Sequence, residues 1–187
     1  PREELMRLVE EFDGMVVVDE AYIDFAEAKS HVGEIASHPN LVVLQTMSKA
    51  WGMAGLRVGL ALADSRVVGL MSQVKYPYNI NVATMKIVSD LLTKGIDEEV
   101  EQIKQQRALV AEALAEFKLV ERVYPSDANF LLVRVADADA LYEHLIKDGI
   151  IVRNRTRVKG CEGCLRITIG LGGENVKLIE SLKRYEK

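Results

Sequence analysis

The sequence predicts an α/β unit with a mostly parallel sheet, followed by a smaller α+β unit. Two early runs, MVVV at 15–18 and LVVL at 41–44, are continuously apolar and do not alternate with polar residues. Strands have this composition when helices cover both faces of a parallel sheet. Beyond residue 96 the pattern changes to short strands and helices, which indicates a small mixed sheet with helices on one side. We therefore expect units at 1–96 and 97–187.

The first unit is expected to begin with an amphipathic helix that feeds the first strand. Four apolar residues at helical spacing predict this helix: Leu5, Leu8, Val9 and Phe12. A third apolar run, VGLALAD at 58–64, completes a set of three strands. A further helix is predicted over VATMKIVSDLLTKG, where Gly95 acts as a stop signal.

The second unit is expected to begin with a long helix at 97–117, whose acidic residues gather in the first turn, where the helix dipole favours them. This helix joins the units in place of a flexible linker. The elements expected after it are the strands LVERVYP and NFLLVRV, a helix over DADALYEHLIKDG, the strands IIVRN and CLRITIG, and the closing helix ENVKLIESLKRYEK.

Composition narrows the class of protein. The chain has 187 residues, 49% apolar and 28% charged, and carries a net charge of −4. These values are typical of globular domains, no apolar run is long enough to cross a bilayer, and an acidic chain is a poor nucleic-acid binder. The only two cysteines form one C-x-x-C, Cys161 and Cys164, which is half a zinc site at best. We interpret it as a loop with two thiols in a reducing compartment, and we predict no metal site.

Polar residues lie where the predicted strands of the first unit end or begin, and ligands of open α/β sheets bind at the carboxyl ends of the strands. The residues are Asp19, Tyr22, Ser48, Lys49 and Arg57. Each one alone has a structural explanation, such as a helix cap, an ion pair between Asp19 and Lys49, or a tight turn. Their combination at strand ends favours a binding site.

The chemistry of this group matches one cofactor. A lysine at the rim of an apolar sheet is expected to be partly desolvated, which makes its amine a nucleophile towards an aldehyde. Asp19 can hold a ring nitrogen protonated, and the Tyr22 hydroxyl can donate to a phenolate oxygen. Ser48, the glycine-rich backbone and Arg57 offer donors to a phosphate. Together they predict a site for pyridoxal 5′-phosphate.

Several motifs carry a family resemblance. VVVDEAYIDF and TMSKAWGMAGLRVG resemble the signature of the fold-type I pyridoxal-phosphate aminotransferases. The resemblance is strongest to the histidinol-phosphate aminotransferase family, through KYPYNIN, SDANFLLVRV, GIIVRNR and CLRITIG. It implies that the first unit holds later strands of the large, cofactor-binding domain of that fold and that the second unit is its small domain.

The resemblance also implies a role for each residue at the strand ends. Lys49 corresponds to the lysine that bonds to the cofactor aldehyde and later moves a proton at the substrate carbon. Asp19 corresponds to the partner of the pyridine nitrogen, and Tyr22 to the partner of the phenolic oxygen. Ser48 and Arg57 correspond to phosphate ligands.

In the second unit, the resemblance assigns Arg166 and Arg153 to the anionic end of the substrate. The residues themselves agree, because VRNRTRVKGCEGCLR concentrates positive charge in an acidic chain. A solvated basic loop remains the alternative for Arg155, Arg157 and Lys159. It explains Arg153 and Arg166 poorly, since one ends an apolar strand and the other lies within one.

The implied reaction converts histidinol phosphate and 2-oxoglutarate to imidazole acetol phosphate and glutamate in histidine biosynthesis, in a cytoplasmic homodimer. Members of the family have about as many residues again before the point that matches Pro1, so we expect this chain to be a carboxyl-terminal half. As a fragment it would be weakly active or inactive, would hold cofactor poorly and would associate with other chains. The alternatives are a threonine-phosphate decarboxylase, an aromatic aminotransferase or an inactive associating fragment.

Overall fold

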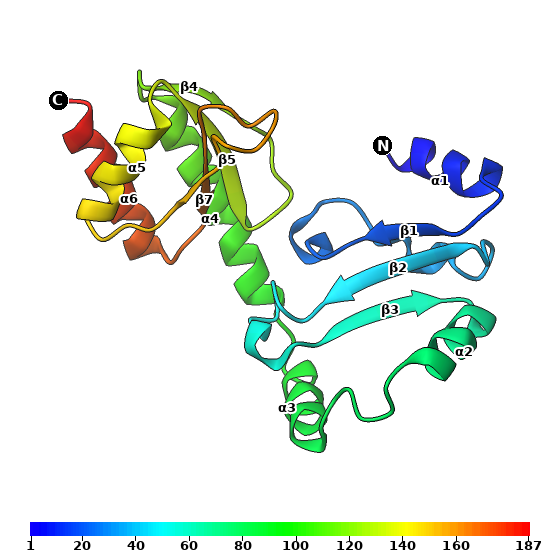
Figure 1. Ribbon diagram of the computed structural model, residues 1–187. Helices are drawn as coiled ribbons and strands as arrows, with labels where there is room; N and C mark the ends of the chain where they lie inside the picture. Colours follow the sequence, from blue (N-terminus) through cyan, green and yellow to red (C-terminus); the bar gives the residue numbers. More distant parts are fainter. The chain divides into compact units, whose positions relative to one another are not determined.

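A computed structural model describes residues 1–187, which divide into two compact units, Pro1–Ile96 and Asp97–Lys187 (Figure 1). Each unit has its own sheet and its own buried cluster, and each is described by itself. None of the helices combines the length and the apolar character that crossing a bilayer requires.

The first unit is built on a sheet of three strands in the order β1-β2-β3. The strands are β1 (Val16–Asp19), β2 (Leu41–Thr46) and β3 (Gly59–Ala63). The helices are α1 (Arg2–Glu11), α2 (Ser65–Val74) and α3 (Val82–Leu92). Three short 3-10 helices, Ile23–Phe25, His31–Glu34 and Ala54–Leu56, shape the connecting loops.

The direction of the third strand differs from the prediction of a mostly parallel sheet. β1 and β2 are parallel, but β3 runs antiparallel to β2, with Thr46 opposite Gly59 and Val42 opposite Ala63. The connection between β2 and β3 contains only one 3-10 turn and no crossover helix. Without such a crossover, the chain turns back along the neighbouring strand and the pair is antiparallel.

Apolar side chains anchor both ends of β2. Near its start, Val9 of α1 packs with Val16, Leu41 and Val43. The Asn40 side chain donates to the carbonyl oxygens of Val9 and Gly14 at 2.8 and 3.2 Å, which fastens the end of α1 to the sheet. A second buried cluster lies beyond the end of β2: Met47, Met53 and Val58.

The second unit has a sheet of four strands in the order β4-β5-β7-β6, and every neighbouring pair is antiparallel. The prediction of a small mixed sheet for this unit is therefore wrong. The strands are β4 (Val120–Val123), β5 (Phe130–Val135), β6 (Arg153–Asn154) and β7 (Cys164–Thr168), and the helices are α4 (Asp97–Ala115), α5 (Ala138–Lys147) and α6 (Gly172–Tyr185).

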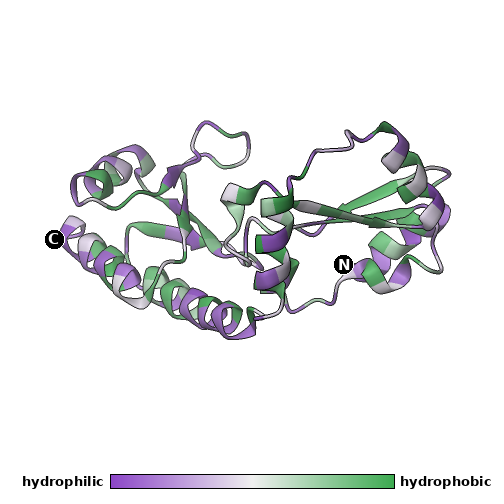
Figure 2. Cartoon of the chain, turned by 90° about the horizontal axis from the view of Figure 1, so that it is seen from below, coloured by the Kyte–Doolittle hydropathy of each residue, from purple (hydrophilic) through white to green (hydrophobic).

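The three helices of the second unit pack with the sheet around one apolar core. Alternate residues of β5, Leu131, Val133 and Val135, are buried in this core, together with Leu165 of β7 and Leu145 of α5. Both sheets consist mainly of apolar residues, whereas the helices carry polar and apolar faces (Figure 2). The alternation of buried and less buried residues along β5 shows that the helices cover one face of the sheet. The other face is left for polar side chains.

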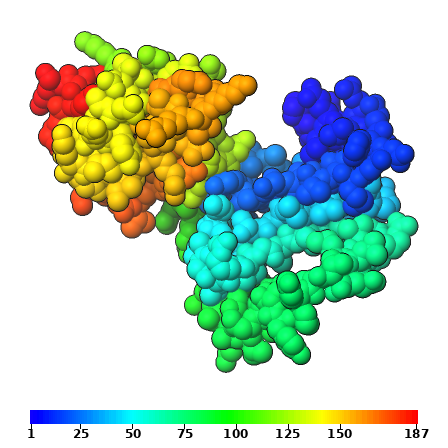
Figure 3. Space-filling model, in the orientation of Figure 1, coloured from blue at the N-terminus to red at the C-terminus, as the bar shows by residue number.

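Helix α2, which the sequence analysis did not predict, is loosely attached. Val74 at its end is 85% exposed, and Tyr76 and Tyr78 just after it are 83% and 93% exposed. The space-filling view shows open space between β3 and the chain that links α2 to α3 (Figure 3). The apolar residues of this stretch therefore contribute little to the core of the first unit.

Truncation of the core should separate buried from exposed leucines. Leu145→Ala removes a side chain with 0% exposure, so we expect it to lower the free energy of unfolding by about 2–5 kcal/mol. Leu109→Ala is the matched control, because Leu109 also lies in a helix of the second unit but is 58% exposed. Its effect should stay within about 0.5 kcal/mol. Urea unfolding measures both, and equal losses would contradict the assigned core.

Candidate functional site

The carboxyl ends of β1 and β2 and the start of β3 lie at one edge of the first sheet. Asp19 is opposite Leu44, and the next amide, that of Glu20, donates to the Leu44 carbonyl at 2.8 Å. Thr46 at the end of β2 is opposite Gly59, the first residue of β3, so Arg57, two residues earlier, lies at this same edge. The antiparallel direction of β3 is what brings Arg57 to the edge that carries Asp19.

The loop that carries Lys49 is fixed by backbone bonds and buried side chains. Met47 donates to the Val58 carbonyl at 3.2 Å, and Met53 donates back to the Met47 carbonyl at 2.9 Å. Gly52 has a φ of +65°, a conformation that favours glycine, and its amide donates to the Lys49 carbonyl at 3.0 Å. The loop therefore has a defined shape, with apolar anchors at both ends.

The structure brings Lys49 and Tyr22 together. The ammonium nitrogen of Lys49 lies 5.3 Å from the centroid of the Tyr22 ring. The Lys49 side chain is nevertheless exposed, so the expectation of a partly desolvated lysine is wrong for this chain. The ring covers one side of the amine, and no other group encloses it.

Asp19 does not form the ion pair with Lys49 that the sequence left open. Its Oδ1 accepts from the Ala21 amide at 3.0 Å, which orients the carboxylate at the end of β1. The Asp19 side chain is exposed. Asp19 and Lys49 thus both remain available to a ligand at the edge of the sheet.

Arg57 has an unusual backbone conformation. Its φ of 56° is the only positive φ of a residue other than glycine in the chain. Such a conformation costs about 1–3 kcal/mol and occurs most often at functional sites. The guanidinium donates to the Ala54 carbonyl at 3.0 Å and is otherwise exposed. The half-buried Ser48 lies on the preceding turn, where its amide donates to the Thr46 hydroxyl at 3.1 Å.

A buried carboxylate next to this edge was missed by the sequence analysis. Glu20 is only 6% exposed, and its oxygens accept from the Ser30 hydroxyl at 2.6 Å, the His31 amide at 2.7 Å and the Gln45 amide nitrogen at 3.1 Å. The His31 Nδ1 also lies 2.9 Å from it. Glu20 therefore joins the end of β1, the loop at 30–31 and β2, and it fixes the backbone that presents Asp19.

The second unit places two arginines side by side. Arg153 of β6 is directly opposite Arg166 of β7, so both side chains lie on the same face of the sheet. The Arg166 guanidinium lies 4.9 Å above the Phe130 ring, and its Nε is buried without a hydrogen-bond partner. Like charges in opposite positions destabilise a strand pair unless an anion lies between them.

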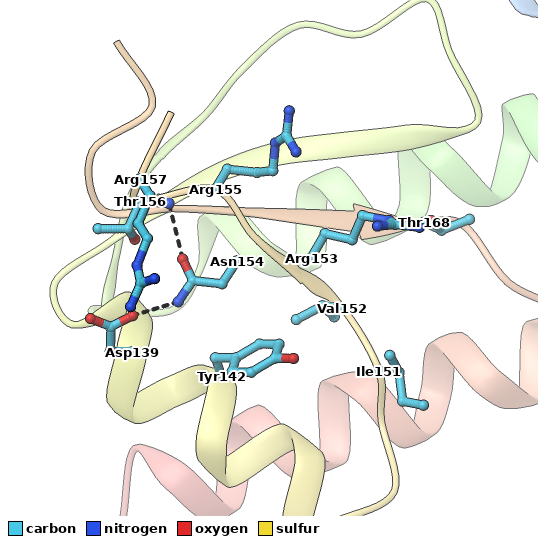
Figure 4. A pocket seen from close by; sticks show the side chains of 10 residues that line it. All are labelled: Asp139, Tyr142, Ile151, Val152, Arg153, Asn154, Arg155, Thr156, Arg157 and Thr168. Carbon is cyan, nitrogen blue, oxygen red and sulfur yellow. Dashed lines mark hydrogen bonds between the residues drawn. The ribbon is translucent and has the colours of Figure 1, made fainter. Parts of the chain in front are cut away.

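A cavity of about 760 Å³ lies beside Arg153 (Figure 4). Arg153, Arg155 and Arg157 line it, and Tyr142 and Asp139 of α5 form the opposite wall. The wall is braced by hydrogen bonds, since Asn154 donates to Asp139 at 2.5 Å and accepts from the Thr156 amide at 2.9 Å.

The solvated-loop alternative therefore holds for only part of the basic stretch. Arg155 is half-buried, and both Arg155 and Arg157 line the cavity beside Arg153. Lys159 is exposed and is not part of the wall. Within the described chain, no three His, Cys, Asp or Glu side chains are arranged to hold a metal ion.

The hydrogen bonds of Glu20 predict a pH-dependent stability. Burial alone would raise the pKa of this carboxyl, but the hydrogen bonds from Ser30, His31 and Gln45 outweigh it and hold the pKa below its ordinary range. A lowered pKa in the folded state stabilises the fold at neutral pH, and this stabilisation is lost as the pH falls through the folded-state pKa.

We expect Glu20→Gln to lower the free energy of unfolding by about 1–3 kcal/mol near neutral pH, because it replaces one acceptor oxygen with a donor. The difference from wild type should shrink as the pH falls through the lowered folded-state pKa of Glu20. Glu112→Gln, at an exposed position in the middle of α4, should change the free energy of unfolding by less than about 0.5 kcal/mol at every pH. Urea unfolding across this range measures all three proteins, and a pH-independent difference would contradict the assignment.

Comparison with known proteins assigns the family. The family model "Aminotransferase class I and II" matches residues 1–182. A histidinol-phosphate aminotransferase of Parabacteroides distasonis is 46% identical over 187 residues, which is 99% of this chain and 54% of the relative. The chain therefore spans about half the length of the curated relative.

Solved structures have the same fold. The histidinol-phosphate aminotransferase of Clostridium acetobutylicum aligns with a TM-score of 0.87 at 28% identity, over 99% of this chain and 57% of that one. A decarboxylase of Sulfurospirillum multivorans aligns with a TM-score of 0.86 at 29% identity, over 100% of this chain and 56% of that one. With the family model matching nearly all of its residues, the chain belongs to the class I and II aminotransferases.

Proposed function

We propose that this chain supplies the lysine-bearing half of a pyridoxal-phosphate transaminase that acts on histidinol phosphate with 2-oxoglutarate. The observation that carries the proposal is the contact of Lys49 with the Tyr22 ring, at a sheet edge that also presents Asp19 and Arg57. The name of the 46% identical relative supports the same substrate.

The residues of the edge fit the cofactor. Bound pyridoxal phosphate supplies an electron sink that stabilises negative charge at a substrate carbon. The Lys49 Nζ, which forms no salt bridge, would hold the cofactor at its aldehyde carbon and would move a proton at the substrate carbon. The second carboxylate oxygen of Asp19 would hold the proton of the ring nitrogen, and the Tyr22 hydroxyl would donate to the phenolic oxygen.

The phosphate of the cofactor would be bound by the loop after β2. Ser48 offers a hydroxyl and Arg57 a guanidinium, and both lie on the fixed loop between β2 and β3. The left-handed backbone of Arg57 is then the strained element whose energetic cost phosphate binding offsets.

The opposed arginines of the second unit would bind the anionic end of the substrate. A phosphate monoester is negatively charged, so it would offset the repulsion between the opposed Arg153 and Arg166. Two guanidinium groups would bind it with directed hydrogen bonds. The carboxylates of 2-oxoglutarate and glutamate would use the same positive charge. An aromatic amino acid has no phosphate to place there.

A decarboxylase that acts on threonine phosphate is the second candidate, because one of the similar structures is a decarboxylase. Its substrate would carry the same phosphate, so the arginines do not separate the two functions. Turnover of histidinol phosphate by the full-length protein, with and without 2-oxoglutarate, does separate them. We expect turnover only with 2-oxoglutarate present.

We also propose that the full-length protein is a cytoplasmic homodimer. Exposed apolar residues of the first unit support an interface between copies: Leu70, Val74, Tyr76, Tyr78 and Val82. The free thiols support a reducing compartment. Light scattering of the full-length protein should give twice the mass of one chain.

Covalent trapping tests the cofactor site directly. After incubation with pyridoxal phosphate and borohydride reduction, peptide mapping should place the label on Lys49, because the edge of the sheet holds the cofactor against this amine. Lys49→Ala should lose the label, and the control Lys94→Ala should keep it at Lys49. Label spread evenly over exposed lysines would sink the proposed site.

Arginine variants test the substrate site. Removing a charge-assisted hydrogen bond costs about 1.5–3 kcal/mol, so Arg153→Ala and Arg166→Ala should each lower kcat/KM of the full-length enzyme for histidinol phosphate by about 10- to 100-fold. Lys159→Ala, in the same basic loop but outside the cavity, is the control and should have no effect. An equal loss in all three variants would mean that only net charge matters.

A further inference from the structure

We propose that Cys161 and Cys164 form a redox-active dithiol, which low-molecular-weight disulfides such as glutathione disulfide oxidise reversibly to an intramolecular disulfide. The proposed transaminase activity does not use either thiol. Both are free in the structure, and no third His, Cys, Asp or Glu side chain completes a metal site with them.

The backbone brings the two cysteines within bonding range. The Cys164 amide donates to the Cys161 carbonyl at 3.0 Å, so residues 161–164 form a turn. The first and fourth Cα atoms of such a turn lie less than about 7 Å apart, and disulfides span about 4.4–6.8 Å. Gly163 has a φ of +69°, and a Cβ there would lie 3.4 Å from the Val135 carbonyl oxygen, so the turn depends on glycine.

The surrounding loop holds this turn in place. The Val158 amide donates to the Arg155 carbonyl and the Cys161 amide to the Val158 carbonyl, both at 2.8 Å. The Arg155 amide closes the series by donating to the Cys164 carbonyl at 2.9 Å. Three consecutive turns thus run from Arg155 to Cys164, and the last bond pairs Arg155 with the first residue of β7. The backbone of the two cysteines is held together before any bond forms, which favours the closed disulfide.

The two sulfurs differ in accessibility, which sets the order of reaction. Cys161 is partly exposed, whereas Cys164 is fully buried on the sheet face where Arg134 is its neighbour across the strands. The Cys164 thiol donates to the Glu162 carbonyl oxygen at 3.7 Å, within the same turn. Cys161 is therefore the sulfur that meets an external disulfide, and Cys164 is the one that resolves the adduct.

The exchange balances with the oxidant named. The Cys161 thiolate attacks one sulfur of glutathione disulfide, which breaks that S–S bond, forms a mixed disulfide and releases one glutathione thiolate. The Cys164 thiolate then attacks the Cys161 sulfur and releases the second glutathione thiolate. The protons of the two protein thiols end on the two glutathione molecules. Excess reduced glutathione reverses both steps.

The test treats the full-length protein with mixtures of oxidised and reduced glutathione, followed by acid quench, maleimide alkylation and mass spectrometry. We expect the wild type to lose the mass of two hydrogen atoms and to incorporate no maleimide at either cysteine. Cys164→Ser should stop at the glutathione adduct on Cys161. Cys161→Ser should react at least about tenfold more slowly than wild type, because only the buried thiol remains.

A second measurement separates the effect of the fold from that of sequence spacing and does not depend on any variant that could misfold. The glutathione ratio that half-oxidises the pair is measured in buffer and in urea. If the fold holds the thiols together, the disulfide should be favoured at least about tenfold more in buffer than in urea. Equal ratios, a glutathione adduct that persists in the wild type, or disulfides only between chains would overturn the proposal.

Discussion

The antiparallel pairing of β2 with β3 is the interaction on which the lysine-bearing edge depends. It places the start of β3 beside the end of β2, so the residues just before β3 and just after β2 meet at one edge. With a parallel third strand, Arg57 would lie at the opposite edge, too far away to share a phosphate with Ser48. The short connection with its buried Met47, Met53 and Val58 both enforces this direction and shapes the loop around Lys49.

The two units differ in how their buried charged groups are hydrogen-bonded. In the first unit, the buried charge of Glu20 is fully met by donors from Ser30, His31 and Gln45, so it stabilises the fold. In the second unit, Arg166 is opposite another arginine, and its buried Nε has no partner. A satisfied buried charge is a structural element, whereas an unsatisfied one calls for an explanation, and for Arg166 we propose a bound anion.

Much of the fold and the site was predictable, because apolar periodicity and glycine punctuation mark the elements. Helices α1, α3 and α4 and the strands that carry Asp19 and Arg166 appear where the sequence analysis placed them. The direction of β3 was not predictable, since GLALA has the same continuous apolar pattern as a buried parallel strand. Helix α2 was missed although Val67, Leu70, Met71 and Val74 recur at helical spacing, and the structure buries none of its residues.

The properties of individual side chains were harder to predict than the elements that carry them. The exposure of Lys49 depends on which groups surround the end of β2, and no local pattern encodes that. The role of Glu20 depends on donors 10, 11 and 25 residues away, and these become neighbours only when β1 and β2 pair.

The strained backbone of Arg57 and the opposed arginines of the second unit support the same interpretation. The left-handed backbone of Arg57 and the pair of opposed arginines each raise the energy of the folded state. A sequence under selection for stability alone would replace them, for instance with a glycine at the left-handed position or a carboxylate across from Arg166. Their presence at a sheet edge and on a sheet face supports the proposal that both surfaces bind anions. In that proposal, one phosphate belongs to the cofactor and the other to the substrate.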